Sequence, residues 1–387
     1  MKAMAITRRG IFVAGASALL GACAIIPKGP TTNAPPPGPQ TGAPGPTQLP
    51  QDETRHRVAL LVPTSGSNAA VGQSIANATT MALLDTNASN LRITTYNTAA
   101  GAGEAARRAI ADGNGIILGP LMGDNVEAVR AIARPAHVPI ISFSNDAKVA
   151  GNDVFVMGHI PEQSVERSVQ YARSHGGRDF AVLAPGGEYG ERAEAALMSA
   201  VRNYGGSVAD VERYTRSNTS VISAAQRLKA KGGFDAVLLA DGTRISILAA
   251  NELKPKGAGP IQLIGTDLWS GEAAVTRAPS LNGAIFSAVS DGRYKRFTES
   301  YSARFGSNPY RIATLGYDAV LLTLRIARDW KPGRPFPAAR LVDPGGFIGL
   351  DGAFRFRPSG LVQRALEVRQ VRNGAVVVVD PAPSKFD

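Results

Sequence analysis

Cysteine and histidine are scarce in this chain of 387 residues, which has one cysteine and four histidines. With Cys23 alone, no disulfide can form within the chain. A domain of this length does not need one, because it buries enough surface to be stable unaided. The four histidines lie far apart and lack the spacing of metal ligands: His56, His137, His159 and His175. We therefore predict no bound metal.

The sequence also lacks the short motifs that accompany common catalytic sites. It has no G-x-S-x-G elbow, no S-x-x-K and no K-T-G, which position serine nucleophiles in hydrolases and in penicillin-reactive enzymes. Gly66 and Gly72 are not followed by Lys-Ser/Thr, so this stretch is not a Walker A loop. Glu162 and Glu166 lie one helical turn apart, as on a solvated helix face. We predict a non-enzymatic protein without a cofactor.

Positive charge predominates but does not gather. The chain has 42 Lys and Arg against 31 Asp and Glu, a formal net charge of +11. Such a surplus is able to attract nucleic acid, anionic lipid or anionic wall polymers. No run of basic residues exceeds two, and the interleaving of aromatic and basic residues found on nucleic-acid platforms is missing. We predict scattered, solvated charge and no nucleic-acid partner.

The apolar stretch near the N-terminus, Gly10–Leu20, is well short of the ~20 residues that a membrane-spanning helix needs. It follows a positively charged segment and precedes small residues, so residues 1–22 form a predicted export signal. The string Leu-Gly-Ala-Cys23 resembles the bacterial lipobox, whose cysteine receives two or three acyl chains that anchor it durably in a membrane. We predict that Cys23 is lipidated; an ordinary secretory signal ending near a cysteine is the alternative.

Residues 23–54 are predicted to be the lipidated cysteine followed by an unfolded tether. Nine prolines fall between Ala24 and Gln51 with almost no apolar bulk, so this segment cannot bury enough surface to offset chain entropy. In extended polyproline II conformation it reaches on the order of 90 Å. Ala24 after the cysteine is similar to lipoproteins sorted to the outer membrane, which favours that membrane over the inner one. Arg8-Arg9 leaves general and twin-arginine export both open.

From Arg57 onward, short apolar runs alternate with helical patterns. The predicted strands are 58–62, 91–96, 115–118, 139–143, 180–183, 207–214, 236–239 and 262–264. Between them lie predicted helices beginning near Val71 and at 104–111, 124–133, 162–175, 191–204, 220–229 and 244–252. Strands alternating with helices are typical of parallel sheets covered on both faces. The sequence therefore predicts the α/β class, and its two series predict two lobes.

The last hundred residues follow a different pattern. After the run 283–288, two consecutive helices are predicted at 294–305 and 311–327. The tail is rich in strand patterns separated by glycine turns, and we predict that its strands are antiparallel.

Small and polar residues gather where the predicted strands end, which is where open α/β sheets bind ligands. Amide groups at helix starts attract a carboxylate, and an acid from the opposite lobe would meet an ammonium group. An amino-acid or peptide-like ligand has both groups. Each turn taken singly also fits ordinary strand-to-helix punctuation. The predicted cleft residues are Ser65, Gly66, Leu121, Met122, Ser142, Phe143, Ser144, Tyr189, Asp241 and Asp267.

Several segments in order resemble the type I periplasmic binding proteins of the leucine-binding group. They are 58–66, 71–75, 116–121, 139–143 and 188–190, and the resemblance covers the chain from Arg57 to its end. It implies a binding domain at 55–387 in which the chain crosses between lobes three times. Lobe one would be about 55–157 plus 285–330, and lobe two about 158–284 plus 331–387, with a hinged cleft between them.

Within that group, Ser142–Asp146 and Val156–His159 resemble the lipoprotein activators of penicillin-binding proteins. Bulky Leu121, Met122 and Phe143 stand where leucine-type sites carry small residues, which favours a filled cleft or one that meets another protein. We therefore prefer a tethered activator that contacts a peptidoglycan synthase. The alternative is a solute receptor that feeds an ABC importer and closes on an amino acid or short peptide.

Overall fold

The computed structural model describes residues 54–257 and 260–386. The predicted export signal, the lipidation site at Cys23 and residues 23–53 of the predicted tether lie outside the described residues. Within the described ranges, no helix is both long and apolar enough to span a membrane.

The first sheet has five parallel strands in the order β2-β1-β3-β4-β5. Its strands are β1 (His56–Val62), β2 (Leu91–Asn97), β3 (Ile116–Leu118), β4 (Ile140–Ser142) and β5 (Val154–Val156). β1 is almost entirely buried, as a parallel strand with helices on both faces should be.

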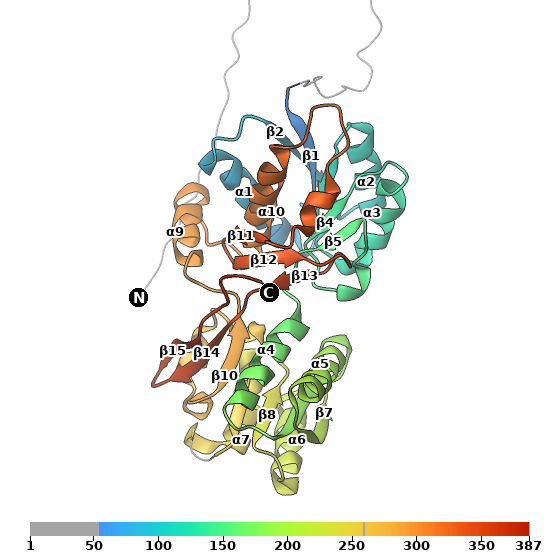
Figure 1. Ribbon diagram of the computed structural model, residues 1–387. Helices are drawn as coiled ribbons and strands as arrows, with labels where there is room; N and C mark the ends of the chain where they lie inside the picture. Colours follow the sequence, from blue (N-terminus) through green and yellow to red (C-terminus); the bar gives the residue numbers. More distant parts are fainter. Residues whose placement is uncertain (1–53, 258–259, 387) are drawn as a thin grey trace, which may run out of the picture. The chain divides into compact units, whose positions relative to one another are not determined.

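Helices cover both faces of the first sheet. In Figure 1, α1 (Ala69–Asp85) and α10 (Ala313–Ala327) lie on one side, and α2 (Ala102–Ala111) and α3 (Val126–Ala133) lie on the other. α9 (Tyr294–Phe305) packs against α1 through a separate cluster that includes Met81 and Tyr301.

The second sheet has the order β15-β14-β10-β9-β8-β6-β7, in which β14 and β15 are antiparallel to their neighbours. Its strands are β6 (Asp179–Pro185), β7 (Ser207–Tyr214), β8 (Ala236–Leu239), β9 (Gln262–Ile264), β10 (Ile285–Ala288), β14 (Glu367–Arg372) and β15 (Ala375–Asp380). The parallel strands β6 to β10 carry helices on both faces, and the antiparallel pair was expected from the tail.

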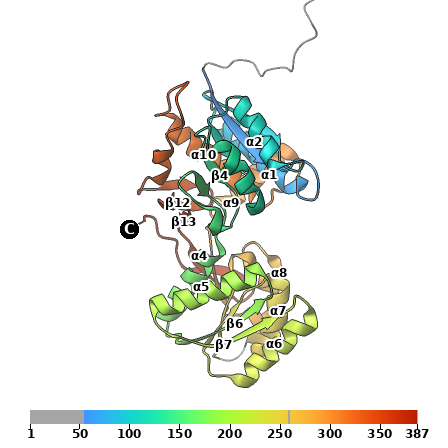
Figure 2. The same cartoon turned by 90° about the vertical axis from the view of Figure 1, so that its right-hand side faces the viewer.

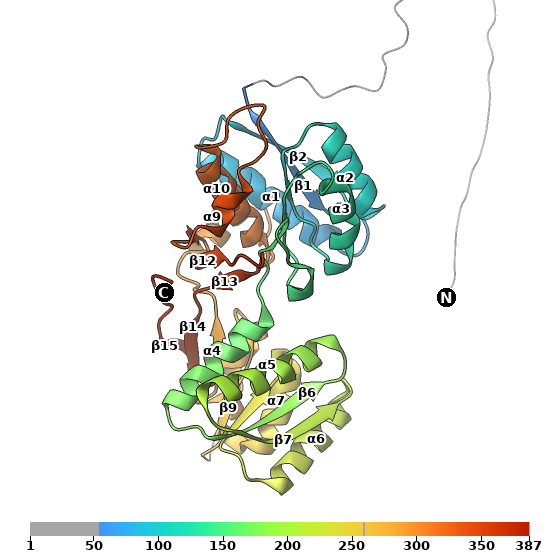
Figure 3. The same ribbon diagram turned by 45° about the vertical axis from the view of Figure 1, so that its right-hand side comes forward.

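Two separate apolar clusters fill the two faces of the second sheet. Figures 2 and 3 show α4 (Pro161–Ser174) and α5 (Glu188–Tyr204) on one face, and α6 (Asn218–Lys231) and α7 (Thr243–Leu253) on the other. Pro161 occupies the first turn of α4, where its missing N–H leaves no bond unmade. The prediction of an α/β fold with two lobes is confirmed.

A small third sheet and several short helices complete the described structure. The third sheet is antiparallel, in the order β11-β12-β13, with β11 (Phe347–Gly349), β12 (Gly352–Phe356) and β13 (Val362–Arg364). The short helices are α8 (Ala273–Arg277) and the 3-10 turns η1 (Gly123–Asn125), η2 (Ala147–Val149), η3 (Pro255–Gly257), η4 (Asp267–Trp269), η5 (Pro279–Leu281) and η6 (Ala338–Val342).

The tail from residue 331 divides between the two lobes, whereas the family resemblance implied that all of it lies in the second. Apolar side chains of η6 and the third sheet, including Phe354 and Phe356, belong to the hydrophobic core of the first sheet. Only β14 and β15 join the second sheet. The strand pattern predicts that these residues pair, but it does not say against which core they pack.

One glycine in each lobe lets a helix approach the strand before it. A Cβ on Gly72 of α1 would lie 1.8 Å from the Pro63 carbonyl oxygen, and a Cβ on Gly190 of α5 would lie 1.8 Å from that of Pro185. No larger residue fits at that separation. These contacts fix the turn that carries Ser65 and the start of α5 that carries Tyr189, so the two lobes join strand to helix in the same way.

Candidate functional site

Three short connections join the first lobe, which comprises the first and third sheets, to the second lobe. The chain passes from β5 to α4 at 157–160, from β10 to α9 at 289–293, and from β13 to β14 at 365–366. Hydrogen bonds join α4, which follows the first connection, to β13, which precedes the third. Gln163 Nε2 donates to the Val362 carbonyl at 2.6 Å, and Gln163 Oε1 accepts from the Arg364 backbone N–H at 2.9 Å.

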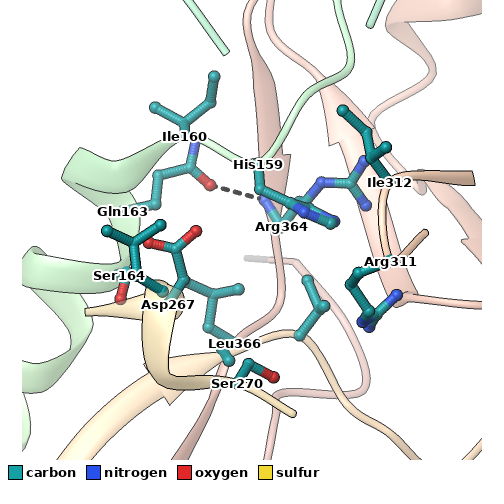
Figure 4. A pocket seen from close by; sticks show the side chains of 13 residues that line it. His159, Ile160, Gln163, Ser164, Asp267, Ser270, Arg311, Ile312, Arg364 and Leu366 are labelled. Carbon is teal, nitrogen blue, oxygen red and sulfur yellow. Dashed lines mark hydrogen bonds between the residues drawn. The ribbon is translucent and has the colours of Figure 1, made fainter. Parts of the chain in front are cut away.

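A cavity of about 250 Å³ lies at these connections, and we call it the connection cavity. All three connections contribute to its wall, together with the first turn of α4, the turn after β9 and the two residues just before α10. Its lining residues are His159, Ile160, Gln163, Ser164, Asp267, Leu268, Ser270, Ala288, Val289, Arg311, Ile312, Arg364 and Leu366. Figure 4 shows His159, Arg311 and Arg364 on one side of it and Asp267 with Ser164 on the other.

Buried charges surround Asp351, which is fully buried behind the cationic side of the cavity. Its carboxylate accepts hydrogen bonds from Arg311 Nη1 at 2.5 Å and from the Thr314 hydroxyl at 2.8 Å, and it lies 2.8 Å from His159 Nε2. Burial alone would raise its pKa, but the Arg311 charge, the His159 hydrogen bond and the Arg364 charge hold the pKa of Asp351 well below its usual range. Asp351 is therefore an anion whose partners are already in place.

Arg364 is also buried, with 6% of its surface exposed, yet most of its hydrogen-bonding capacity is unused. Its Nη2 donates to the Met157 carbonyl. Its Nε and Nη1 have no hydrogen-bond partner among the described residues. Burial lowers the pKa of Arg364, and the charges of Asp351 and Asp318 oppose this effect. The guanidinium stays protonated in proteins, so Arg364 is a buried cation with hydrogen bonds left unmade.

Asp267 faces the cavity from the second lobe, at the start of η4. Its Oδ1 is buried and has no hydrogen-bond partner among the described residues. Burial raises the pKa of Asp267 to about 6, and the negative charge of Glu162 contributes to this rise. Near neutral pH this carboxylate would gain from a donor or cation brought by a ligand.

The other predicted cleft residues of the second lobe lie beside Asp267. The Tyr189 hydroxyl donates to Thr266 Oγ1 at 2.9 Å, and burial followed by the charges of Asp267 and Asp241 raises the Tyr189 pKa. Asp241 accepts from the Tyr214 hydroxyl at 3.0 Å and lies 3.4 Å from Arg216 Nε. Since Asp241 is already paired, Asp267 is the acid of this group with an oxygen left unsatisfied.

The buried cleft residues predicted in the first lobe already have hydrogen-bond partners or lie in the core. Ser142 is buried and donates to the Pro120 carbonyl, and the Ser144 hydroxyl accepts from the Asp146 backbone N–H. Phe143 is 1% exposed and belongs to the core of the first sheet. The expectation that Phe143 fills the cleft is therefore wrong, because its side chain points into the core.

Ser65 and Gly66 lie in an exposed turn, where the Ser65 hydroxyl accepts from Asn97 Nδ2 at 2.9 Å. Leu121 is half-buried against the core of the first sheet, whereas Met122 is 42% exposed. Neither Leu121 nor Met122 lines the connection cavity.

Two polar contacts link the first lobe to the start of α5. Arg192 Nη2 donates to the Asn145 carbonyl at 2.8 Å while its Nε and Nη2 bind the Glu162 carboxylate. Lys148 Nζ lies 3.7 Å from Glu188 Oε1. These contacts join a loop of the first lobe to the second.

Sequence reasoning missed His159, Gln163, Arg311 and Arg364 as site residues. His159 was considered only as a metal ligand and within a family resemblance. Arg311 opens a predicted helix, and Arg364 lies in the strand-rich tail, directly before a predicted strand. Their one local signal is a charge inside an apolar pattern, as in Leu361-Val-Gln-Arg364-Ala-Leu366. No group of three or more His, Cys, Asp or Glu in the described ranges is arranged to hold a metal ion.

A family model described as periplasmic binding protein matches residues 56–375. Among curated proteins, an uncharacterised protein of Rickettsia prowazekii is 28% identical over 182 residues. That match covers 46% of this chain and 48% of the relative, so the alignment spans about half the length of each.

Solved structures share the fold. A protein from Rhodospirillum rubrum, described as a branched-chain amino acid ABC transporter, has a TM-score of 0.75 at 20% identity, covering 84% of this chain and 100% of its own. A substrate-binding protein from Streptococcus pneumoniae, in complex with isoleucine, has a TM-score of 0.61 at 19% identity. The match covers 84% of this chain and 100% of that protein. A solute-binding protein from Rhodopseudomonas palustris, in complex with 3,4-dihydroxybenzoic acid, has a TM-score of 0.63 at 19% identity. The match covers 87% of this chain and 98% of that protein.

Proposed function

This chain belongs to the periplasmic binding protein family, and on that premise we propose that it is a non-enzymatic receptor that captures a small solute for an ABC importer. Family membership indicates a periplasmic location. The observation that carries the proposal is the connection cavity, whose wall includes all three connections between the lobes. A ligand held there touches both lobes and the segments that must bend when the lobes move, which is how hinge closure is coupled to binding.

The cavity chemistry supports a small ligand with both an apolar body and a polar end. Apolar side chains of Ile160, Val289, Ile312 and Leu366 share its wall with the buried charges. At about 250 Å³ it falls just below the ~300–1,000 Å³ of sites for drug-sized molecules. The structural neighbours were solved with isoleucine and with 3,4-dihydroxybenzoic acid, both of which combine a carboxylate with an apolar body.

The neighbours favour the receptor over the activator that the sequence led us to prefer. Those described above are named as ABC transport proteins, and two of them were solved with a small solute bound. One argument for the activator was a cleft filled by Phe143, and that side chain lies in the core instead. The contact with a peptidoglycan synthase stays a prediction, and pull-down from solubilised envelope tests it.

We further propose that Cys23 anchors the receptor by its acyl chains and that residues 24–51 act as a spacer. The proline-rich composition supports a spacer with a reach on the order of 90 Å. Ala24 after the cysteine supports the outer membrane over the inner one. Fractionation of membranes on a density gradient tests the placement: recovery of the protein with inner-membrane markers would contradict it.

Calorimetric titration of the protein purified in detergent tests the receptor. We expect micromolar binding of at least one member of a panel of branched-chain amino acids, benzoates and short peptides. The Asp267→Asn variant removes the carboxylate of the cavity. We expect it to lower the affinity for ligands that carry an ammonium group more than the affinity for ligands that lack one. Silence across the panel, together with capture of a synthase from the envelope, would favour the activator instead.

A further inference from the structure

After β15 the chain crosses from the second lobe to the first once more. β15 ends at Asp380, whose carboxylate lies 2.7 Å from Arg167 Nη2 on α4 of the second lobe. Further along, the ring centre of Phe386 lies 4.9 Å from the guanidinium carbon of Arg355, which belongs to β12 in the first lobe. We call residues 381–386 the strap, and Figures 1 and 2 show it running from β15 to the third sheet.

The far end of the strap packs on the outer face of the third sheet. Phe354 and Phe356 point into the core of the first lobe, so Arg355 between them points to the opposite face. Phe386 meets Arg355 there and also lies close to Gly346, where an added Cβ would be 3.1 Å from Phe386 Cε2. These contacts leave the Phe386 side chain half-buried.

The strap runs beside the third connection between the lobes. A second cavity, of about 420 Å³, has Pro383 and Phe386 of the strap and Leu366 of the connection in its wall. Tyr204 of α5 lines it from the second lobe, and Gln363 of β13 lines it from the first. The strap is therefore a neighbour of a segment that bends when the lobes move.

The strap is short and stiff. Even fully extended, the chain from Asp380 to Phe386 spans at most about 20 Å. Pro381 and Pro383 fix their own backbone angles and favour an extended, semi-rigid segment. A rotation that carries β15 away from the third sheet must therefore pull Phe386 off Arg355 once the strap is straight.

We propose that the strap is a fourth link between the lobes and restrains their rotation about the three connections. It favours the lobe orientation in which Phe386 contacts Arg355, and any solute or partner that selects another orientation acts against it. The restraint goes beyond the proposed function, because it operates in the free chain and does not depend on what the chain binds.

Hydrogen–deuterium exchange, measured by mass spectrometry on the full-length protein in detergent without added solute, tests the restraint. The reporter is the first connection, where the Met157 and Gly158 amides donate to the Ser142 and Ser144 carbonyls. No residue from 157 to 160 lines the strap cavity in the described structure. A cation–π contact shifts an equilibrium roughly 2- to 5-fold, so Phe386→Ala should speed exchange at the first connection by about that factor.

Phe305→Ala is the matched control. It also truncates a half-buried phenylalanine, but one whose ring packs against Tyr301 within the first lobe. It should speed exchange around α9 and leave the first connection unchanged. Phe386→Trp should keep the exchange of the wild type, because an indole ring also packs on a guanidinium group.

Pro381→Gly combined with Pro383→Gly keeps Phe386 but slackens the strap, and it should speed exchange at the first connection to a smaller extent. This second variant still decides if thermal unfolding shows that Phe386→Ala is not folded. Faster exchange confined to the strap, Gly346 and β12 would mean local packing alone and would overturn the restraint, as would unchanged exchange in both variants. Either result leaves the receptor proposal standing, since no solute takes part in the measurement.

Discussion

Replacing Asp267 by asparagine is expected to stabilise the ligand-free protein at neutral pH and to change its stability little at pH 4. The Asp267 carboxyl is buried, and its Oδ1 has no hydrogen-bond partner among the described residues. Burial raises its pKa from the ordinary value of 3.8 to about 6, and Glu162 adds to the rise. At neutral pH the folded chain therefore holds a buried carboxylate with one oxygen unsatisfied, which asparagine replaces by a neutral group of similar shape.

The magnitude follows from the two pKa values. Below 3.8 the carboxyl is protonated in both the folded and the unfolded chain, so its ionisation costs nothing. Between pH 4 and 6 the folded chain binds more protons than the unfolded one, so the free energy of unfolding falls as pH rises. The pKa values differ by about 2, each pKa unit being worth ~1.36 kcal/mol, so the full cost above pH 6 is about 3 kcal/mol. Imperfect accommodation of the amide reduces the expected gain to about 1–3 kcal/mol.

Urea denaturation of both proteins at about pH 4, 5, 6 and 7.5 measures this effect. The difference between wild type and variant isolates Asp267, because the titration of His159, whose pKa burial lowers, affects both proteins alike. We expect the difference to grow from near zero at pH 4 to a plateau above pH 6. A difference that does not change with pH, or a variant that is less stable at pH 7.5, would refute the reasoning.

Three further predictions concern single residues. Asp351→Asn leaves the buried cations around it uncompensated and should lower the free energy of unfolding by about 3–5 kcal/mol, whereas Asp329→Asn, which breaks an exposed ion pair, should cost about 0–1 kcal/mol by the same urea assay. Gly190→Ala forces a Cβ against a carbonyl oxygen and should cost about 1–3 kcal/mol or more, while Gly186→Ala, whose nearest new contact is 3.8 Å away, should stay within about 0.5 kcal/mol. Cys23→Ala should abolish incorporation of labelled palmitate and release the protein from membranes; label retained by the variant would contradict lipidation at this site.

Helices and strands could be predicted closely from the sequence because each buries one face or both. The strands at 207–214, 236–239 and 262–264 and the helix at 294–305 agree with the structure residue for residue. Continuous apolar runs identify strands that helices cover on both faces, and this alternation implies parallel sheets. The strand β5 was not among the predicted strands.

The predictions for the strand ends were less complete, and Phe143 shows why. Placing a residue at the carboxyl end of a strand does not say on which side its chain lies, because successive side chains point to opposite faces. The Ser142 hydroxyl donates to the Pro120 carbonyl, and the Phe143 side chain packs in the core of the first sheet. Of the ten predicted cleft residues, Asp267 alone lines the connection cavity.

By itself the sequence determined the type and order of the elements and the α/β class, because periodic burial is a local property of the chain. Tertiary structure alone decided which charges meet. His159, Arg311 and Arg364 come from three separate passages of the chain, and the connections between the lobes bring them to one cavity. In the sequence each resembles a solvent-exposed polar residue, because burial of a charge depends on neighbours far along the chain. His159 contacts Asp351, 192 positions away, and Arg364 donates to Met157, 207 positions away.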